Sequence, residues 1–211
     1  MAEIRPFAAY RPAGGLERRI AALPYDVYSR GEAKKEVERN PESFLAIDRA
    51  ETGFEDSVDT CAPEVYERAA GLLEEWIRRG RFVQDEKPCY YLYEQIMEGR
   101  SQTGIVACAS VDDYVNQVVK KHENTREEKE LDRIRHVDAC NMQTGPIFLA
   151  YRKNEVLQKI IASVKEGKPE CEFTSDDQIV HRVWVIDDGE RISAVYEACI
   201  LRTAITAARL R

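Results

Sequence analysis

Residues 90–111 read YYLYEQIMEGRSQTGIVACASV. Tyr90–Met97 and Thr103–Val111 are rich in aromatic and β-branched residues, and the residues between them include Gly99. Two such runs separated by a short glycine-containing segment predict antiparallel strands joined by a turn. We therefore expect a β-hairpin near the middle of the chain.

Helical patterns precede this hairpin. Between Pro63 and Gly80, apolar residues recur at three- and four-residue steps, with proline suited to a first helical turn and glycine to a stop. Ser29 and Glu32 match a capping box, in which each side chain bonds the other residue's backbone amide, and predict a helix to about Arg39. The apolar run Ser43–Ile47 predicts a short buried strand between these helices.

Helices and strands also alternate after the hairpin. Thr125 and Glu128 match a second capping box, which predicts a charged helix with an apolar stripe of Leu131, Ile134 and Val137. The remaining expected elements are a strand over 147–151, a helix over 155–164, a strand over 181–186 and a helix over 192–209. This mixture predicts an α/β fold, or α+β, with a mixed sheet, a hairpin and flanking helices. We expect one globular domain over residues 1–211.

Composition narrows the classes of function. The 211 residues are 44% hydrophobic and carry a net charge of -7, so a disordered tail is excluded and a broad DNA-binding surface is disfavoured. No apolar run approaches the roughly 20 residues of a membrane span. The N-terminus lacks the pattern of a secretory signal, so we expect a cytoplasmic protein without a membrane partner. Its oligomeric state stays open.

The metal-binding residue types are few and scattered. The six cysteines are spaced singly, without a Cys-x-x-Cys motif, and the histidines are His122, His136 and His181. Zinc sites and redox dithiols use closely spaced cysteines and histidines. We therefore expect no metal site, and cysteines that serve mainly as buried small apolar residues.

The densest group of charges lies between Lys120 and Arg133. On a helix that begins near Thr125, the side chains of Arg126, Lys129, Glu130 and Arg133 share one face. These cations, together with His122, could hold a phosphate or a carboxylate. The alternative is a solvated helix face in which Glu130 pairs with Arg126 or Arg133.

Other polar positions are weaker candidates. Asp112 and Asp113 could ligate magnesium, but adjacent residues of a strand point to opposite faces. Asp26 and Glu32 form an acidic pair near the N-terminus, although Glu32 also fits the capping box. Thr144 and Gly145 could bring a hydroxyl and a close backbone to a ligand, or form a plain turn.

Six short motifs agree in order with one known family. They are IRPF (4–7), LPYDV (23–27), NPESFL (40–45), QTG (102–104), KHENTR with KELDR (121–133), and TGPIF (144–148). Over residues 3–187 the chain resembles the bacterial family called domain of unknown function 1015. That family resembles the ParB and sulfiredoxin-like fold, which includes nucleotide-using enzymes such as free-serine kinases.

The resemblance implies a nucleotide, with magnesium, as a cofactor. It also implies an Asp-Gly-His-His-Arg signature at the start of a late helix, where this chain has CILRTA over residues 199–204. Of the five signature residues, only the final arginine has a counterpart here, Arg202. Longer family members continue beyond this segment. A shortened or decayed member, or a sequence with residues missing, fits this pattern, and phosphotransfer is expected to be slow or absent.

Two functions follow as expectations. The first is a domain that binds a nucleotide or another phosphorylated or carboxylated small molecule, with phosphotransferase ancestry. The second is a non-catalytic regulatory module or a ParB-like DNA-associated module. The expected acid–base residues are Asp26, Glu32, His122 and Glu123. The expected ligand-binding residues are Lys121, Thr125, Arg126, Lys129, Arg133, Thr144, Gly145 and Arg202.

Overall fold

The structure, a computed structural model, describes residues 2–121, 125–202 and 205–207. The chain gathers into two compact units. Unit 1 comprises Met1–Tyr10, Gln84–Asn124 and Pro146–Arg211, and unit 2 comprises Arg11–Val83 and Thr125–Gly145. Both helices and strands are present, which confirms the mixed α/β prediction. The expectation of one domain over residues 1–211 stays a prediction.

The predicted hairpin forms the centre of unit 1. Strands β4 (Tyr90–Met97) and β5 (Arg100–Val106) are antiparallel, and Glu98 and Gly99 connect them with positive φ angles of 51° and 77°. Two consecutive positive φ values are typical of a tight hairpin turn. Strands β10 (Val180–Ile186) and β9 (Cys171–Thr174) complete the sheet in the order β5-β4-β10-β9, which is antiparallel throughout.

The second strand of the hairpin ends earlier than predicted. β5 stops at Val106, β6 (Cys108–Ala109) pairs with β1 (Ile4–Arg5), and Val111–Val115 forms helix α5. The Ser110 hydroxyl caps α5 by accepting a hydrogen bond from the Asp113 amide at 3.4 Å. Asp112 and Asp113 therefore occupy a first helical turn, where carboxylates are favourable, and not a strand end.

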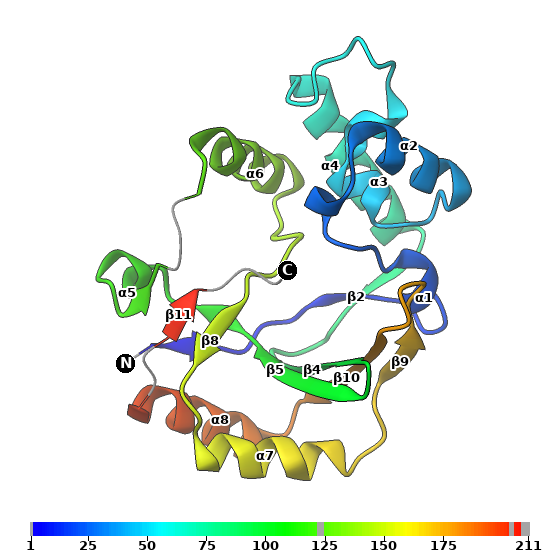
Figure 1. The fold of residues 1–211 in the computed structure, drawn as a ribbon. Helices are drawn as coiled ribbons and strands as arrows, with labels where there is room; N and C mark the ends of the chain where they lie inside the picture. The colour runs from blue at the N-terminus through cyan, green and yellow to red at the C-terminus, as the bar shows by residue number, and fades with distance from the viewer. Residues whose placement is uncertain (1, 122–124, 203–204, 208–211) are drawn as a thin grey trace. The chain divides into compact units, whose positions relative to one another are not determined.

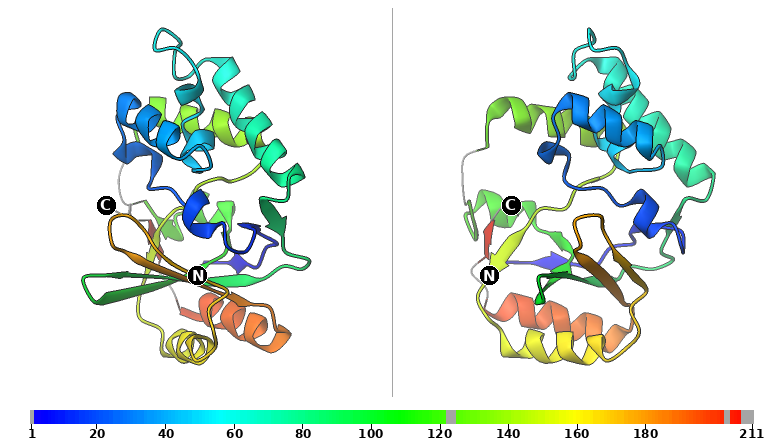
Figure 2. Two further views of the ribbon diagram at one scale, coloured as in Figure 1. Left: turned by 90° about the vertical axis from the view of Figure 1, so that its right-hand side faces the viewer. Right: turned by 45° about the vertical axis from the view of Figure 1, so that its right-hand side comes forward.

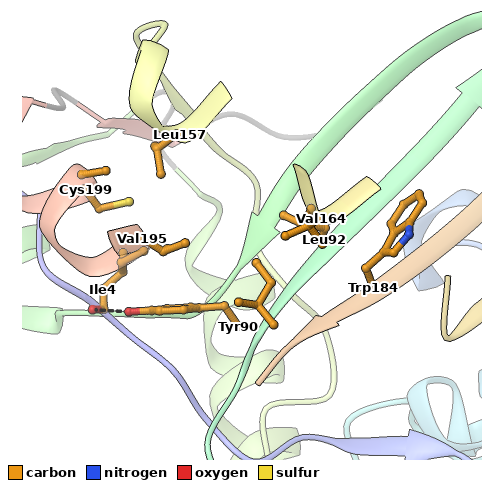
Figure 3. Close-up of a cluster of buried hydrophobic side chains, with 10 residues drawn as sticks. Ile4, Tyr90, Leu92, Leu157, Val164, Trp184, Val195 and Cys199 are labelled. Atoms are coloured by element: carbon orange, nitrogen blue, oxygen red, sulfur yellow. Dashed lines mark hydrogen bonds between the residues drawn. The ribbon is translucent and has the colours of Figure 1, made fainter. Parts of the chain in front are cut away.

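Helices α7 (Glu155–Lys165) and α8 (Gly189–Arg202) cover one face of the four-stranded sheet (Figure 1). Side chains of a strand alternate between faces, so Tyr90 and Leu92 of β4 point toward these helices. Figure 3 shows the resulting core, in which Leu157 and Val164 of α7 and Val195 and Cys199 of α8 lie around Tyr90 and Leu92. The Tyr90 hydroxyl donates to the Ile4 carbonyl at 3.1 Å.

The last helix, in the C-terminal part of unit 1, ends earlier than predicted. The last helix was predicted to reach Arg209, but α8 ends at Arg202 and Ile205–Ala207 forms strand β11. β11 lies between β7 (Val119–Lys120), to which it is parallel, and β8 (Leu149–Tyr151), to which it is antiparallel. Ile205 and Thr206 are β-branched residues, which favour a strand when a partner strand is available.

A charged residue is buried at one end of the unit 1 core. The side chain of Glu94 on β4 is 2% exposed and forms ion pairs with Lys165 of α7 and Arg182 of β10. The Ser101 hydroxyl of β5 donates to the same carboxylate. Burial alone raises the pKa of Glu94, but hydrogen bonds from Lys165 and Ser101 outweigh it and hold this pKa below its usual range.

Unit 2 is mainly helical, as Figure 2 shows. Its longer helices are α2 (Arg30–Arg39), α4 (Pro63–Arg78) and α6 (Glu127–Cys140), and its shorter elements are α1 (Glu17–Ile20), η1 (Tyr25–Val27), α3 (Leu45–Asp48) and η2 (Ala50–Gly53). Strands β2 (Tyr10–Pro12) and β3 (Phe82–Gln84) pair where the chain passes between the units. Ile47, Ala69 and Trp76 are among the buried residues that form the unit 2 core. The predicted helix over 63–80 is confirmed as α4.

The predicted capping box at the start of α2 is confirmed. The Ser29 hydroxyl accepts from the Glu32 amide at 3.4 Å, and Glu32 Oε2 accepts from the Ser29 amide at 2.8 Å. The Ser29 hydroxyl also donates to Glu32 Oε2 at 2.6 Å, and the hydrogen bonds from the Ser29 hydroxyl and amide hold the pKa of Glu32 below its usual range. Glu32 therefore has a structural role that is complete without catalysis.

Replacing Ser29 with alanine tests this cap. We expect Ser29→Ala to lower the free energy of unfolding by about 1 kcal/mol, because an amide at the helix start loses its acceptor. Urea unfolding at neutral pH measures the change, with Ser57→Ala in an exposed turn as the control. Equal losses in both variants would contradict the cap's contribution.

The strand predicted over Ser43–Ile47 is wrong. Leu45–Asp48 forms helix α3, and the Ser43 hydroxyl accepts from the Leu45 amide at 3.3 Å. A short apolar run has no periodicity that separates a buried strand from a buried helical turn. Tertiary packing decides the case here, because Leu45 and Ile47 are fully buried.

Helix α6 differs from its prediction at its start and in its buried face. It begins at Glu127 after the extended residue Arg126, without a side-chain cap, so the predicted capping box at Thr125 is wrong. Leu131 and Ile134 of the predicted stripe are 44% and 49% exposed, whereas His136 is buried. A polar face of α6 therefore packs inside unit 2.

Candidate functional site

The polar face of α6 borders a pocket of about 400 Å³ within unit 2. Its other walls come from η1, from the end of α3 with η2, and from the start of α4 (Figure 1). Ionisable side chains dominate the lining, which includes Asp26, Asp48, Lys129, Asp132, Arg133 and His136. A pocket lined by so many ionisable side chains suits a small polar ligand better than an apolar one.

Four of these residues come from α6 because of their spacing. Arg133 follows Lys129 by four residues and His136 follows Asp132 by four residues, so the helix aligns both pairs on one side. Lys129 is exposed and forms no ion pair with any residue that the structure describes. Its ammonium group is therefore available to a ligand.

Arg133 is held in place by two partners. Its Nε and Nη2 atoms lie 3.0 and 2.9 Å from Asp132 Oδ2, and its guanidinium carbon lies 4.2 Å from the centre of the Tyr25 ring. Asp132 Oδ1 in turn accepts from the Tyr66 hydroxyl of α4 at 2.9 Å. Burial and this hydrogen bond raise the pKa of Tyr66, so the hydroxyl stays protonated. The Arg133 side chain is 29% exposed and lines the pocket.

A second group of polar side chains surrounds Asp48. The Thr144 hydroxyl lies 3.2 Å from Asp48 Oδ1, and Arg133 Nη1 and His136 Nε2 lie 3.8 and 4.0 Å from the same oxygen. Burial raises the pKa of Asp48, and the nearby His136 and Arg133 only partly offset this effect. A carboxyl with a perturbed pKa inside a pocket is a candidate functional group.

The hydrogen bonds of His136 assign its tautomer. His136 Nε2 lies 3.1 Å from the Ile47 carbonyl oxygen, which only accepts, so Nε2 carries a proton. Nδ1 lies 3.4 Å from the Thr144 hydroxyl oxygen and 3.9 Å from Cys140 Sγ. Burial raises the pKa of Cys140 to about 11. This thiol is therefore protonated at neutral pH and unsuited to act as a nucleophile.

The structure brings together part of the predicted site. Asp26, Lys129 and Arg133 line the same pocket, and Thr144 contacts two of its buried residues. The alternative prediction, that Glu130 pairs with Arg126 or Arg133, is wrong. Arg133 pairs with Asp132, and Arg126 pairs with Glu128.

Other predicted residues lie elsewhere. Lys121 is exposed and belongs to unit 1, and Arg202 lies at the end of α8 in the same unit. Thr125, Arg126 and Gly145 belong to unit 2 and are exposed outside the pocket lining. Gly145 has open space around its Cα, so nothing there requires a glycine. His122 and Glu123 lie outside the described residues.

The polar pocket residues that the sequence analysis missed include Asp48, Tyr66, Asp132 and His136. The helical spacing of Asp132 and His136 with Lys129 and Arg133 carried a usable signal, since all four share a face. No sequence signal pointed to Asp48, because the segment before it was predicted to be a strand. Tyr66 reads as an ordinary apolar position of α4.

The described residues contain no group of three or more histidine, cysteine or acidic side chains arranged to hold a metal ion. None of the six cysteines forms a disulfide with another described residue, and Cys89, Cys140 and Cys199 are buried whereas Cys108 is exposed. Within the described ranges, no helix is both long enough and apolar enough to cross a bilayer. Lys129 and Arg133 are the pocket groups suited to a phosphate or carboxylate.

One family model covers almost the entire chain. The model, described as "Protein of unknown function (DUF1015)", matches residues 4–207. The chain belongs to the DUF1015 family. Membership in DUF1015 confirms the resemblance drawn from the six motifs, and both the α6 segment and Thr144 lie inside the matched range. Neither a curated protein nor a solved structure matches this DUF1015 chain.

Proposed function

We propose that the unit 2 pocket binds a small molecule that carries a phosphate or a carboxylate. The observation that carries this proposal is the pair Lys129 and Arg133, which lie one helical turn apart on α6 and line the same pocket. Lys129 forms no ion pair within the described part of the chain, and Arg133 is oriented by Asp132 and Tyr25. An oriented guanidinium and a nearby ammonium suit the geometry of a bound oxyanion.

The pocket also offers groups for proton transfer. Asp48, Thr144 and the imidazole of His136 form one connected network beside Arg133. These groups support the phosphotransferase ancestry implied by the DUF1015 resemblance, with a nucleotide and magnesium as the expected cofactor. The missing Asp-Gly-His-His-Arg signature favours the second candidate, a non-catalytic regulatory or DNA-associated module.

Charge-neutralising substitutions test the anion site. We expect Lys129→Gln and Arg133→Gln each to weaken binding of a ligand anion by about 10- to 100-fold, which corresponds to about 1.5–3 kcal/mol for a charged hydrogen bond. Isothermal titration with inorganic phosphate, phosphoserine and ATP measures the affinities. Arg135→Gln is the matched control, because Arg135 is an exposed arginine of α6 outside the pocket lining.

Four outcomes separate the candidates. Loss of affinity in the two pocket variants alone supports the anion site, and an equal effect of Arg126→Gln would move the site toward the face predicted from sequence. Binding of none of the anions by the wild-type chain would reject the proposal. Tight binding of duplex DNA that weakens steeply with salt would favour the DNA-associated alternative.

A further inference from the structure

The pocket carries more negative than positive groups. Its lining contains the carboxylates of Asp26, Asp48, Glu51, Glu128 and Asp132, against the cations of Arg49, Lys129 and Arg133. A ligand that is only an anion would gain from the cations but would be repelled by nearby carboxylates. The excess of carboxylates therefore restricts which anions the pocket can bind.

Several of these carboxylates already have partners. Glu51 pairs with Arg49, which also donates to the carbonyl oxygens of Tyr25 and Tyr28 at 2.9 and 2.8 Å. Asp132 is occupied by Tyr66 and Arg133, as described above. These two carboxylates stabilise the walls of the pocket and have little free capacity for a ligand.

Asp48 differs from them. Its recorded contacts with Thr144, Arg133 and His136 all involve Oδ1. Oδ2 receives no hydrogen bond from any residue in the described ranges, although the side chain is only 17% exposed. An ionised carboxylate accepts hydrogen bonds and donates none. Oδ2 is not among the fully buried polar atoms that lack a partner, so a hydrogen-bond donor of a ligand in the pocket can reach it.

We infer that the ligand carries, besides its anionic group, a hydroxyl or ammonium group that donates a hydrogen bond to Asp48. This inference rests on the proposed function, because Lys129 and Arg133 provide the anion site. The ligand class is thus a hydroxylated or aminated phosphate or carboxylate. A donor on the ligand converts the local carboxylate from a repulsive group into a specific contact.

The energetics of Asp48 support a role in binding. Burial raises the pKa of this carboxyl, so its ionised form is costly in the ligand-free protein. Asp48→Asn keeps the acceptor for Thr144 and removes the buried charge, and we expect its thermal midpoint to be unchanged or higher. A residue that lowers stability in the absence of ligand is typical of functional sites.

Three small phosphates test the inference by isothermal titration. Methyl phosphate carries the anion without a further donor, glycerol 3-phosphate adds hydroxyl groups, and phosphoethanolamine adds an ammonium group. We expect at least one of the latter two to bind the wild-type chain about tenfold or more tightly than methyl phosphate, and this preference to vanish in Asp48→Asn. Asp138→Asn, on an exposed position of α6, is the control for loss of one charge.

The outcomes distinguish this inference from the proposed function. A preference for the hydroxylated or the aminated probe that depends on Asp48 supports the inference and identifies the donor. Equal affinities for all three phosphates that still require Lys129 would overturn it and leave the anion site standing. Failure of all three to bind would overturn both. If Asp48→Asn unfolds, equal wild-type affinities for the three probes still overturn the inference.

Discussion

Leu92→Ala is expected to lower the free energy of unfolding of unit 1 by about 2–5 kcal/mol, the range for deleting a buried leucine side chain. Leu92 lies on the central strand β4, is fully buried, and packs between the sheet and helices α7 and α8. The substitution removes apolar contacts and leaves a cavity. Because β4 is paired with a strand on each side, the sheet cannot shift easily to fill that cavity. Native-state hydrogen exchange of peptides from β4 and β10 measures the loss.

Met97→Ala provides the control on the same strand. Met97 is 56% exposed at the end of β4, so its truncation should change the stability by no more than about 0.5 kcal/mol. Equal effects of the two substitutions would contradict the assigned core. The same data test the single-domain prediction. If the chain is one cooperative domain, Leu92→Ala should also speed hydrogen exchange in α4 of unit 2. If the units are independent, exchange should become faster in unit 1 alone.

Lys165→Met is expected to destabilise unit 1 by about 3 kcal/mol at neutral pH, because removing one partner of a buried ion pair leaves an uncompensated charge. The carboxylate of Glu94 is 2% exposed, and Lys165 of α7 is the ion-pair partner that hydrogen-bonds to it. Arg182 lies farther away, at 3.5 Å, and also pairs with Glu172. It replaces only part of the lost interaction.

The effect should depend on pH. Since the pKa of Glu94 is lowered in the folded chain, the stabilisation is present above the unfolded pKa of about 4.3 and is lost as the pH falls through the folded value. The difference between wild type and Lys165→Met should therefore shrink below about pH 4. Urea unfolding at several pH values measures it. The pair Glu94→Leu and Lys165→Met together should recover most of the stability, and a pH-independent loss would contradict the ion-pair explanation.

Local signals explain the parts of the fold that the sequence predicts. The hairpin over 90–106, the capping box at Ser29 and the amphipathic helix α4 each depend on residues close together in the chain. The predictions that were wrong concern segments whose structure depends on residues far away in the chain. Ser43–Ile47 becomes helical because of its burial against distant residues, and the buried face of α6 is polar because its partners lie in an earlier segment of unit 2.

The same distinction applies to the candidate site. The spacing of Lys129 and Arg133 was enough to place them together, because a helix fixes the relation between neighbouring turns. Asp48 meets His136 and Thr144 only after two segments far apart in the chain have packed. No local pattern encodes that meeting. The two-unit arrangement is likewise invisible in the sequence, since each unit consists of separated segments.

The interleaved order of these segments has a consequence for synthesis on the ribosome. Unit 2 is complete once Gly145 has been made, whereas β4 must wait for its central neighbour β10, which begins at Val180. During this interval the nascent β4 has one free edge, and Glu94 lacks Arg182 throughout and Lys165 until residue 165 has been made. The helical unit, whose pocket we propose as the ligand site, therefore has all its residues available while the sheet is still an unfinished hairpin.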